Sequence, residues 1–451
     1  MEALLKNIKT FPVGGIHPEE NKLSAAEPVE KLLPPGMVSI PIAQHIGKPA
    51  KPVVNPRDKV LVGQLIAKGD GFVSANIHAS VSGTVTKIDK VLDSTGYKRE
   101  AILIRTDGDV WMPEIDQTDN LLKQIDLGRE EILKKIADAG IVGLGGATFP
   151  SHVKLAVSTG KKAEFLLLNG VECEPYLTAD HRLMLEKSEE ILVGAQILMK
   201  ALQVEKAYIG IEINKPDAIA RMKNLLSGYP GIEVQALKVQ YPQGGEKQLI
   251  KAILNREVPS GGLPIDVGVV VHNVGTAFAV YEAVQKNKPL LERVMTVTGK
   301  SVAHPANLWV RIGTPVQALI DAAGGIPEDT GKIINGGPMM GKAINDTNIP
   351  VTKGTSGILI IPNEEAHRAP VKVCIRCSKC VTVCPIGLEP YLLMTLNEKE
   401  LFDRLEQGAV LDCIECGSCS FTCPSDRPLL DYIRLGKKTV ASKIKERSSK
   451  P

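Results

Sequence analysis

The sequence predicts a multidomain α/β protein with a separate cysteine-rich segment near its C-terminal end. Two observations support this prediction. Short apolar runs alternate with helical patterns through the middle of the chain, as in parallel sheets with crossover helices, and eight of the nine cysteines fall within fifty residues near the end. The 451 residues are enough for about three domains with their own cores. Differences in composition and in the pattern of apolar residues place domains at 1–110, 125–290, 291–362 and 363–440.

The composition is that of an ordinary globular chain. Hydrophobic residues make up 43% and charged residues 23%. A net charge of +3 is too small to indicate nucleic-acid binding, and 4% aromatic residues weakens a base-stacking role further. There is no run of 18 apolar residues, and "MEALLKNIKTF" has too short an apolar core for a signal peptide. We expect no membrane span, and a compartment that keeps thiols reduced.

The first segment, 1–110, reads as short strands broken by glycine turns. Its stretch "VLVGQLIAKGDGFVSANIHASVSGTVTKI" resembles the two halves of a biotinyl/lipoyl barrel-sandwich domain, "VxxGQxIA" and "SVSGTV". A carrier domain of this type has an acceptor lysine in the hairpin between the halves. The hairpin "GDGFVSANIHAS" has none, so we expect a structural or docking module rather than a swinging arm.

The second segment alternates strands and helices. Strands are expected at "AEFLLLNG", "KAYIGIEIN", "GIEVQALKV" and "VGVVVHN", and helices at "EEILKKIADAG", "PDAIARMKNLL", "GEKQLIKAIL" and "TAFAVYEAVQK". The first of these helices should end at Gly140. This order predicts a Rossmann-like parallel sheet, which binds its ligand at the carboxyl ends of the strands.

The third segment, 291–362, is smaller and richer in strands. The runs "RVMTVTG" and "ANLWVRIG" flank a loop, "PVQALIDAAGG" is a helix, and "KIINGGPMMGKAI" passes through a glycine-rich corner. A strand pair crossed by one helix suggests a β-grasp domain. The end of the chain, "GKKTVASKIKERSSKP", is basic, and we expect it to be a frayed, solvated tail.

The cysteines form two runs, "CIRCSKCVTVCP" and "CIECGSCSFTCP", each with spacing i, i+3, i+6 and i+10 and a proline after the fourth. This is the bacterial ferredoxin spacing, in which the fourth cysteine of each run binds the cluster of the other run. We therefore assign one [4Fe–4S] cluster to Cys374, Cys377, Cys380 and Cys423, and a second to Cys413, Cys416, Cys419 and Cys384. Zinc usually takes two separated CxxC pairs, and disulfides need an oxidising compartment. We therefore favour iron–sulfur clusters over zinc sites or disulfides for these cysteines.

A glycine-rich stretch, "GIVGLGGATFP", lies between two helical patterns. Gly143, Gly145 and Gly146 would let backbone N–H groups approach an anion, and the following helix N-terminus would add a positive dipole. Lys154, about one turn further on, could add charge against a phosphate. Glycines also serve ordinary turns, so this loop alone is weak evidence for a nucleotide.

Polar residues follow two expected strands. "NGVECEP" places Asn169, Glu172 and Glu174 at one strand end, although a capped, solvated turn explains this stretch equally well. "HNVGT" places His272, Asn273 and Thr276 at another, and "GGEKQ" adds Gly245 and Glu246 before a helix. Cys173, outside the two runs, is expected to be a small buried packing residue.

The stretches "GLGGATFPSHVK", "NGVECEP" and "HNVGT", in this order, resemble the flavin- and NADH-binding motifs of the NADH-oxidising subunit of respiratory complex I. That resemblance continues through an SLBB β-grasp domain, here with "GGPMMG", but the complex I subunit then ends with one cluster. With the head "GGIHPEENK" and two ferredoxin runs, the whole arrangement resembles the RnfC subunit of the Rnf complex, a membrane-bound NAD:ferredoxin oxidoreductase of bacteria.

The resemblance implies that NAD(H) exchanges a hydride with bound FMN, and that two [4Fe–4S] clusters pass electrons to other Rnf subunits at the cytoplasmic face of the membrane. It implies a peripheral subunit in contact with NAD(H). The implied flavin residues are Gly143, Gly145, Gly146, Lys154, Asn169 and Asn273. Glu174, taken as catalytic, and Phe149 would contact nicotinamide and adenine. The remaining candidates for cofactor binding are Glu172, Gly245, Glu246 and Thr276.

The chain departs from the family pattern at two positions. Thr148 stands where the loop commonly has glycine, and Val171 where complex I has aspartate. The long lysine- and alanine-rich extension of some Rnf subunits is missing, so we expect a short form. Two alternatives are a cobalamin (corrin) reductase of bacterial microcompartments, which lacks the "GGIHPEENK" head, and a scaffold that carries clusters without flavin. Reconstitution with FMN and NADH would separate them.

Overall fold

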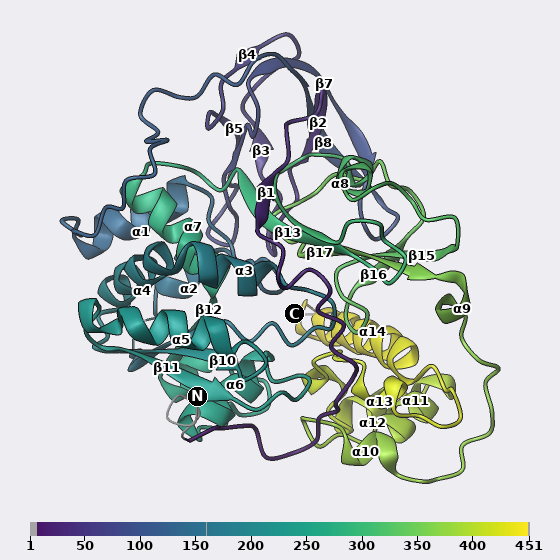
Figure 1. Ribbon diagram of the computed structural model, residues 1–451. Coiled ribbons are helices and arrows are strands. Elements are labelled where there is room, and N and C mark those ends of the chain that lie inside the picture. The colour runs from purple at the N-terminus through teal and green to yellow at the C-terminus, as the bar shows by residue number, and fades with distance from the viewer. Residues whose placement is uncertain (1–6, 159, 450–451) are drawn as a thin grey trace.

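A computed structural model describes residues 7–158 and 160–449. Figure 1 shows a β-rich domain at the top, an α/β domain at the lower left, a mixed β domain at the right and a helical domain at the lower right. None of the described helices is both long enough and apolar enough to cross a membrane.

The N-terminal domain consists of two facing β-sheets, as the barrel-sandwich pattern predicts. The larger, antiparallel sheet has the order β2 (Met37–Pro41), β8 (Lys98–Thr106), β7 (Gly83–Leu92) and β4 (Lys59–Val60). The smaller sheet contains β3 (Lys51–Pro52), β5 (Leu65–Lys68) and β6 (Ile77–His78). The loop 69–76 between the two halves packs on the α/β domain, because Asn76 Nδ2 donates to Asp138 O over 3.1 Å. This contact fits a docking module.

The α/β domain contains a four-stranded parallel sheet, and its strands are the four that the sequence predicts. Their order is β11 (Ile232–Leu237), β10 (Lys206–Glu212), β9 (Phe165–Asn169) and β12 (Val269–Asn273). The chain order reverses between β9 and β12, and such a switch point is where open parallel sheets bind ligands. The register pairs Asn273 with Asn169 at this position.

Seven helices accompany this sheet: α1 (Arg129–Asp138), α2 (Ser151–Leu155), α3 (Ala179–Glu186), α4 (Ser188–Leu202), α5 (Pro216–Leu225), α6 (Glu246–Leu254) and α7 (Val274–Gln285). Gly140 follows α1 with φ +64, the left-handed conformation that ends a helix. Helices α4 and α7 approach closely at Gly194, where an added Cβ would lie 2.0 Å from Ala277 O. Glycine at this position allows the two helices to pack.

The third domain is a six-stranded mixed sheet with one long connection through α8 (Val316–Ala322). Its strand order is β1 (Val29–Lys31), β14 (Ala306–Arg311), β13 (Glu292–Thr298), β17 (Gly357–Pro362), β15 (Thr330–Asn335) and β16 (Lys342–Ile344). The helix and the first strand pair are those expected. The sequence did not reveal β1, which comes from the N-terminal end of the chain and pairs in parallel with β14.

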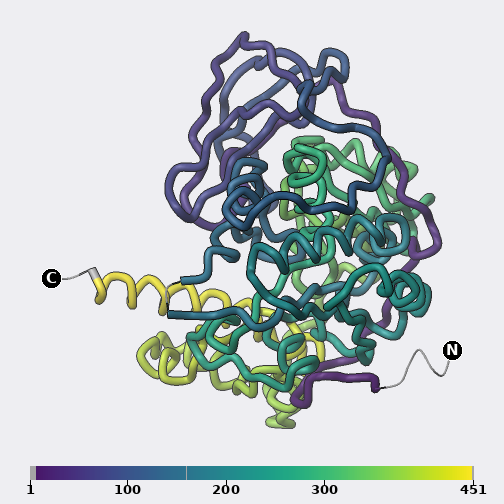
Figure 2. The backbone as a smooth tube through the Cα atoms, turned by 90° about the vertical axis from the view of Figure 1, so that its left-hand side faces the viewer, coloured from purple at the N-terminus to yellow at the C-terminus, as the bar shows by residue number. Residues whose placement is uncertain are grey.

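After the short helix α9 (Asn363–Ala366), the cysteine-rich domain contains α10 (Lys379–Thr382), α11 (Pro390–Glu398), α12 (Phe402–Gln407), α13 (Ser418–Phe421) and α14 (Leu429–Ser449). The expectation of a frayed basic tail is wrong, because α14 continues through it (Figure 2). Val440 is buried in a core with Leu429 and Ile433, and Ile444 packs against it. The apolar residues among the lysines therefore hold the helix onto the domain.

Residues 7–31, named here the N-terminal arm, cross three of the four domains. The arm runs along the α/β domain, passes beside the cysteine-rich domain and ends in β1 (Figure 1). Lys9 forms a bridge with Leu237, and Ile16 forms one with Tyr241. Gly15 N donates to Val383 O over 2.9 Å. The arm thus links domains that are far apart in sequence.

Candidate functional site

The carboxyl ends of β9 and β12 meet the glycine-rich loop 143–149 at the switch point. Asn273 is the N-cap of α7: its Oδ1 accepts from Gly275 N over 2.8 Å, and its Nδ2 donates to Asn169 O over 3.3 Å. A Cβ added at Gly145 would lie 2.9 Å from the Asn273 side chain. The structure therefore brings the loop, Asn169 and Asn273 together, as their places in the sequence predict.

The loop is anchored at its base and open at its tip. Gly143 N donates to Phe149 O over 2.9 Å, and Leu144 N donates to the buried hydroxyl of Thr276 over 3.0 Å. Gly145 and Gly146 are exposed, and their N–H groups have no partner in the described part of the chain. Free amides beside the N-terminus of α7 fit a phosphate group. Thr276 thus acts as an anchor of the loop.

Thr148 has an unusual backbone conformation within this loop. Its φ is +55, a region that β-branched residues rarely adopt. Threonine at this position therefore strains one residue of the loop.

Lys154, on α2, lies at the edge of the same site. Its Nζ donates to Glu246 Oε1 over 2.6 Å and to Val271 O over 2.7 Å. Glu246 begins α6, whose N-cap is Gly245, so the weaker candidates from "GGEKQ" do join the site. The ion pair partly neutralises Lys154, which reduces the charge it can offer to a phosphate.

Two carboxylates of the "NGVECEP" loop hold it to neighbouring elements. Glu172 accepts from the N–H groups of Asp180 and His181, over 2.7 and 3.1 Å, and so caps helix α3. Glu174 accepts from Met339 N over 3.2 Å and from Met340 N over 2.8 Å, in the SLBB-type domain. Burial raises the pKa of Glu174 to about 7. The alternative of a capped turn describes Glu172, but the loop itself is packed rather than solvated.

A lysine from the N-terminal arm holds this loop through three hydrogen bonds. Lys22, in "GGIHPEENK", donates from Nζ to the carbonyl oxygens of Glu172, Glu174 and Leu177, over 2.8, 2.9 and 2.6 Å. Burial lowers the pKa of Lys22 to about 8. The sequence marked the motif, but its role as a clamp depends on contacts about 150 residues away.

Asp180 is a residue of the site that the sequence analysis missed. Its Oδ2 accepts from Asn273 Nδ2 over 2.6 Å, and it lines a cavity with Gly275 and Arg293 beside the glycine loop. Burial raises the pKa of Asp180 to about 7, and the charge of Glu172 adds to this effect. No motif marks Asp180, because it lies in the first turn of a helix, where acidic residues are common.

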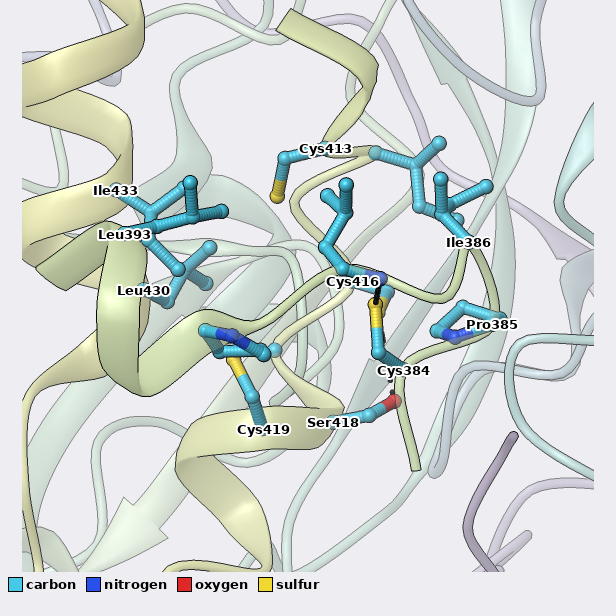
Figure 3. Close-up of a pocket in the computed structure, with 14 residues that line it drawn as sticks. Cys384, Pro385, Ile386, Leu393, Cys413, Cys416, Ser418, Cys419, Leu430 and Ile433 are labelled. Carbon is cyan, nitrogen blue, oxygen red and sulfur yellow. Dashed lines mark hydrogen bonds between the residues drawn. The ribbon is translucent and has the colours of Figure 1, made fainter. Parts of the chain in front are cut away.

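Cys384 lies with the second cysteine run, as the crossing of ligands requires. Cys384, Cys413, Cys416 and Cys419 line one cavity with apolar side chains around it (Figure 3). We name this the inner cluster site. The sulfur atoms of these four cysteines surround the cavity. This arrangement suits a cubane cluster with one thiolate at each iron. Nowhere in residues 7–158 and 160–449 do three His, Cys, Asp or Glu side chains stand ready for a single metal ion.

The other four cysteines form a more open site, named here the outer cluster site. Cys374 and Cys377 are exposed, whereas Cys380 and Cys423 are half-buried. Burial raises the pKa of the Cys380 thiol, and the nearby Cys423 and Cys374 raise it further. Cys380 therefore has one neighbour from its own run and one from the second run.

The inner cluster site packs directly against the α/β domain. Tyr241 Oη donates to Cys416 O over 2.8 Å, and Ile16, Tyr241 and Cys416 form an apolar group with Cys173 and Met339. Cys173 is half-buried there, consistent with a packing role, and its Sγ accepts from Gly244 N over 3.3 Å. The "NGVECEP" loop thus reaches from the switch point to the inner cluster site.

These features define a multidomain iron–sulfur flavoprotein. Family models match as follows: the RnfC barrel sandwich hybrid domain at 9–109, the Nuo51 FMN-binding domain at 136–282, the SLBB domain at 294–343 and the 4Fe-4S dicluster domain at 368–424. The chain belongs to the RnfC family, which supplies one subunit of the ion-translocating ferredoxin:NAD⁺ oxidoreductase, or Rnf, complexes. It is thus part of a multi-subunit oxidoreductase, with an FMN-binding domain and a dicluster domain.

Three relatives illustrate this membership. The RnfC-type subunit of the proton-translocating ferredoxin:NAD⁺ oxidoreductase complex of Clostridium ljungdahlii is 48% identical over 95% of this chain and 93% of its own length. Its Na⁺-translocating counterpart from Acetobacterium woodii is 46% identical over 95% and 96%. The equivalent subunit of the ion-translocating oxidoreductase complex of Rhodobacter capsulatus is 44% identical over 86% and 76%. The corrin reductase is therefore set aside, and the match to an FMN-binding domain counts against the flavin-free scaffold.

Proposed function

We propose that this subunit exchanges a hydride with NAD(H) at the switch point of the α/β sheet and passes single electrons through its two cluster sites to a neighbouring subunit. FMN, when bound, supplies the chemistry that couples a two-electron hydride to one-electron carriers. The observation that supports this proposal is the shared loop 169–174, which borders the glycine loop at one end and the inner cluster site at the other.

The residues that would hold FMN lie around the tip of the glycine loop. The N–H groups of Gly145 and Gly146, with the N-terminus of α7, would receive the phosphate. Asn169 and Asn273 would line the crevice beside them, and Lys154 would stand at its edge. The unpaired amides fit an anion without any change in the backbone.

NAD(H) would contact the same site from the side of Glu174 and Phe149. Phe149 closes the glycine loop through its backbone and is half-buried, so part of its ring remains available to a base. Glu174 would hold the nicotinamide or a ribose hydroxyl only by sharing the carboxylate that now accepts from Met339 and Met340. Dinucleotide binding would then be linked to the position of the SLBB domain.

We further propose an order for the two clusters. The inner cluster site accepts electrons first, because it packs on Tyr241 and Cys173 of the α/β domain. The outer cluster site is the exit, because Cys374 and Cys377 face solvent.

In the assembled complex the protein would lie at the cytoplasmic face of the membrane, attached through other subunits. Chaotrope should therefore release it from membranes. Resistance to alkaline extraction would contradict a peripheral position.

An absorption experiment on anaerobically purified protein tests the central proposal. After FMN is added, NADH should bleach the flavin and then the broad visible band of the iron–sulfur clusters. Failure to bind FMN together with failure of NADH to bleach either chromophore would support a cluster-only role instead.

Electron paramagnetic resonance tests the ligand sets. Replacing Cys384 with alanine should perturb the signal of the cluster bound by Cys413, Cys416 and Cys419, because Cys384 lines their cavity. The matched variant Cys423→Ala should perturb the other signal. A Cys384→Ala effect confined to the cluster of Cys374, Cys377 and Cys380 would mean that each run holds its own cluster.

A further inference from the structure

The outer cluster site is bordered by an apolar ridge, defined here as Val371, Val373 and Ile375. Their exposed fractions are 59%, 83% and 67%, and every residue from 367 to 379 is exposed. The segment is held in place, since Lys372 N donates to Ser425 O over 2.9 Å and Ser425 Oγ donates to Val373 O over 3.0 Å. These side chains therefore face solvent from an anchored backbone.

A fourth exposed, large apolar side chain belongs to the second cysteine run. Phe421, two residues before Cys423, is 57% exposed. Large apolar side chains gathered beside one functional group are uncommon on surfaces that stay in water, and such patches mark interaction sites. Exposed apolar side chains therefore stand next to cysteines of the outer cluster site in both runs: Val373 and Ile375 beside Cys374, and Phe421 two residues before Cys423.

Unpaired positive charge accompanies the ridge. Between residues 368 and 379 the chain has four basic side chains and no Asp or Glu. Arg368 pairs with Asp431, and the nearest carboxylate to Lys372 is that of Asp426 at 3.9 Å. Neither Arg376 nor Lys379 has a salt-bridge partner among residues 7–158 and 160–449. This charge is complementary to an acidic surface.

The inner cluster site is covered, in contrast. Cys384, Cys416 and Cys419 are each 8% exposed, and a Cβ added at Gly14 of the N-terminal arm would lie 2.6 Å from Cys384 O. The arm and the α/β domain therefore cover the backbone around this site. A partner that exchanges electrons with the chain approaches a cluster most closely at the outer site.

We propose that the apolar ridge, with Arg376 and Lys379, is the surface on which another subunit of the same complex docks through an acidic, electron-carrying face. The proposal rests on the proposed order of the clusters. A resident subunit fits better than a soluble carrier, because permanent interfaces are more apolar, whereas transient redox contacts are small and wet. The ridge supplies the apolar centre, and the basic residues supply the charged rim.

Rebinding to stripped membranes tests this surface. Membranes of the producing bacterium, freed of this protein by chaotrope, are incubated with the purified Val373→Asp or Arg376→Glu variant. Each change should weaken rebinding at least tenfold, and Arg376→Glu should also reduce its dependence on salt. Val110→Asp, at an exposed apolar residue of the N-terminal domain, should rebind as the wild type does.

Spectra of the isolated variants separate failure of docking from failure of the proposed function. NADH should bleach the flavin and reduce both clusters in every variant; absence of bleaching in the wild type would overturn the proposed function and not the docking surface. If Val373→Asp lost the outer cluster signal, Arg376→Glu, which alters no apolar contact, would decide. Unchanged rebinding of both variants would overturn the proposal.

Discussion

Glu174 combines a position beside the dinucleotide crevice with a contact to another domain. Its carboxylate accepts two backbone N–H groups, and burial raises its pKa from 4.5 to about 7. The folded protein therefore binds a proton between these values that the unfolded chain does not bind. The stability from this group is full below about pH 4.5 and is lost as pH rises through 7.

Replacing Glu174 with glutamine should remove this pH dependence. Between about pH 5.5 and 8, the free energy of unfolding of the wild type should fall by about 2 kcal/mol relative to that of Glu174→Gln. Urea unfolding at both pH values measures the difference. Glu30→Gln, at an exposed glutamate, should show no such change, and parallel pH profiles for wild type and Glu174→Gln would contradict the assignment.

The same variant tests the contact with NADH. If the carboxylate holds a nicotinamide or ribose hydroxyl, its loss costs on the order of 1.5–3 kcal/mol. Glu174→Gln should then raise the NADH concentration needed for flavin reduction by roughly ten- to a hundredfold, with FMN content and both clusters intact. Stopped-flow bleaching at several NADH concentrations is the measurement. An unchanged concentration dependence would leave Glu174 only its contact with the SLBB domain.

Thr148 offers a gain in stability. Its φ of +55 strains a β-branched residue, and glycine adopts this conformation freely. Thr148→Gly should raise the free energy of unfolding by about 1 kcal/mol, which is the lower end of the cost of such strain. Thr86→Gly, in the extended strand β7, should lower it instead. Thermal unfolding of the two variants distinguishes the signs.

At the scale of elements, the Lys22 clamp connects the N-terminal arm with the loop at the site. Lys22→Met would leave the carbonyl oxygens of Glu172, Glu174 and Leu177 without their donor. Each unpaired buried group costs about 1–3 kcal/mol, so amides of residues 172–177 should exchange with deuterium much faster. Hydrogen-exchange mass spectrometry measures this, with the exposed Lys31→Met as control. Equal protection in both variants would show that the loop is held by other contacts.

The elements that could be predicted are those whose signals lie within a short stretch of chain. The four strands of the parallel sheet are apolar runs ended by polar residues, and Gly140 ends α1 through its own conformation. Strand β1 could not be predicted, because "VEK" becomes a strand only by pairing with residues 307–309. Helix α14 could not be predicted for a similar reason. Val440 and Ile444 are isolated apolar residues in a lysine-rich stretch, and only the fold shows that they pack in an apolar core.

At the scale of the whole molecule, Lys353 joins three domains at one buried point. Its Nζ donates to Asn76 O of the N-terminal domain over 2.8 Å and to Gly140 O of the α/β domain over 2.7 Å. Burial lowers the pKa of Lys353 from 10.5 to about 7. Above this value the folded protein has released a proton that the unfolded chain still binds, so stability rises with pH until about 10.5.

Replacing Lys353 with methionine should therefore flatten the pH profile of stability. From about pH 7 to 9, the free energy of unfolding of the wild type should rise by about 2–3 kcal/mol relative to that of Lys353→Met. Denaturant unfolding across this range is the measurement. The exposed Lys342→Met should follow the wild type. A constant difference between wild type and Lys353→Met would mean that the amine keeps its ordinary pKa in the junction.

The candidate site was predictable where spacing alone sets the geometry. Asn169 and Asn273 end neighbouring parallel strands, so they meet at the switch point, and the cysteine spacing anticipated Cys384 beside the second run. The partners of Glu174 could not be foreseen, because Met339 and Met340 lie about 165 residues away in another domain. Asp180 could not be predicted as a site residue, because its hydrogen bond with Asn273 forms only in the folded protein.

The N-terminal arm also has a consequence for biosynthesis. The ribosome releases it first, yet one of its partners is Val383, and at about 5–20 residues per second that residue is made tens of seconds later. Once docked, Gly14 lies against the backbone of Cys384. The arm can therefore complete this contact only after the first cysteine run has been made. One of the first segments to be translated thus depends, for this contact, on one of the last.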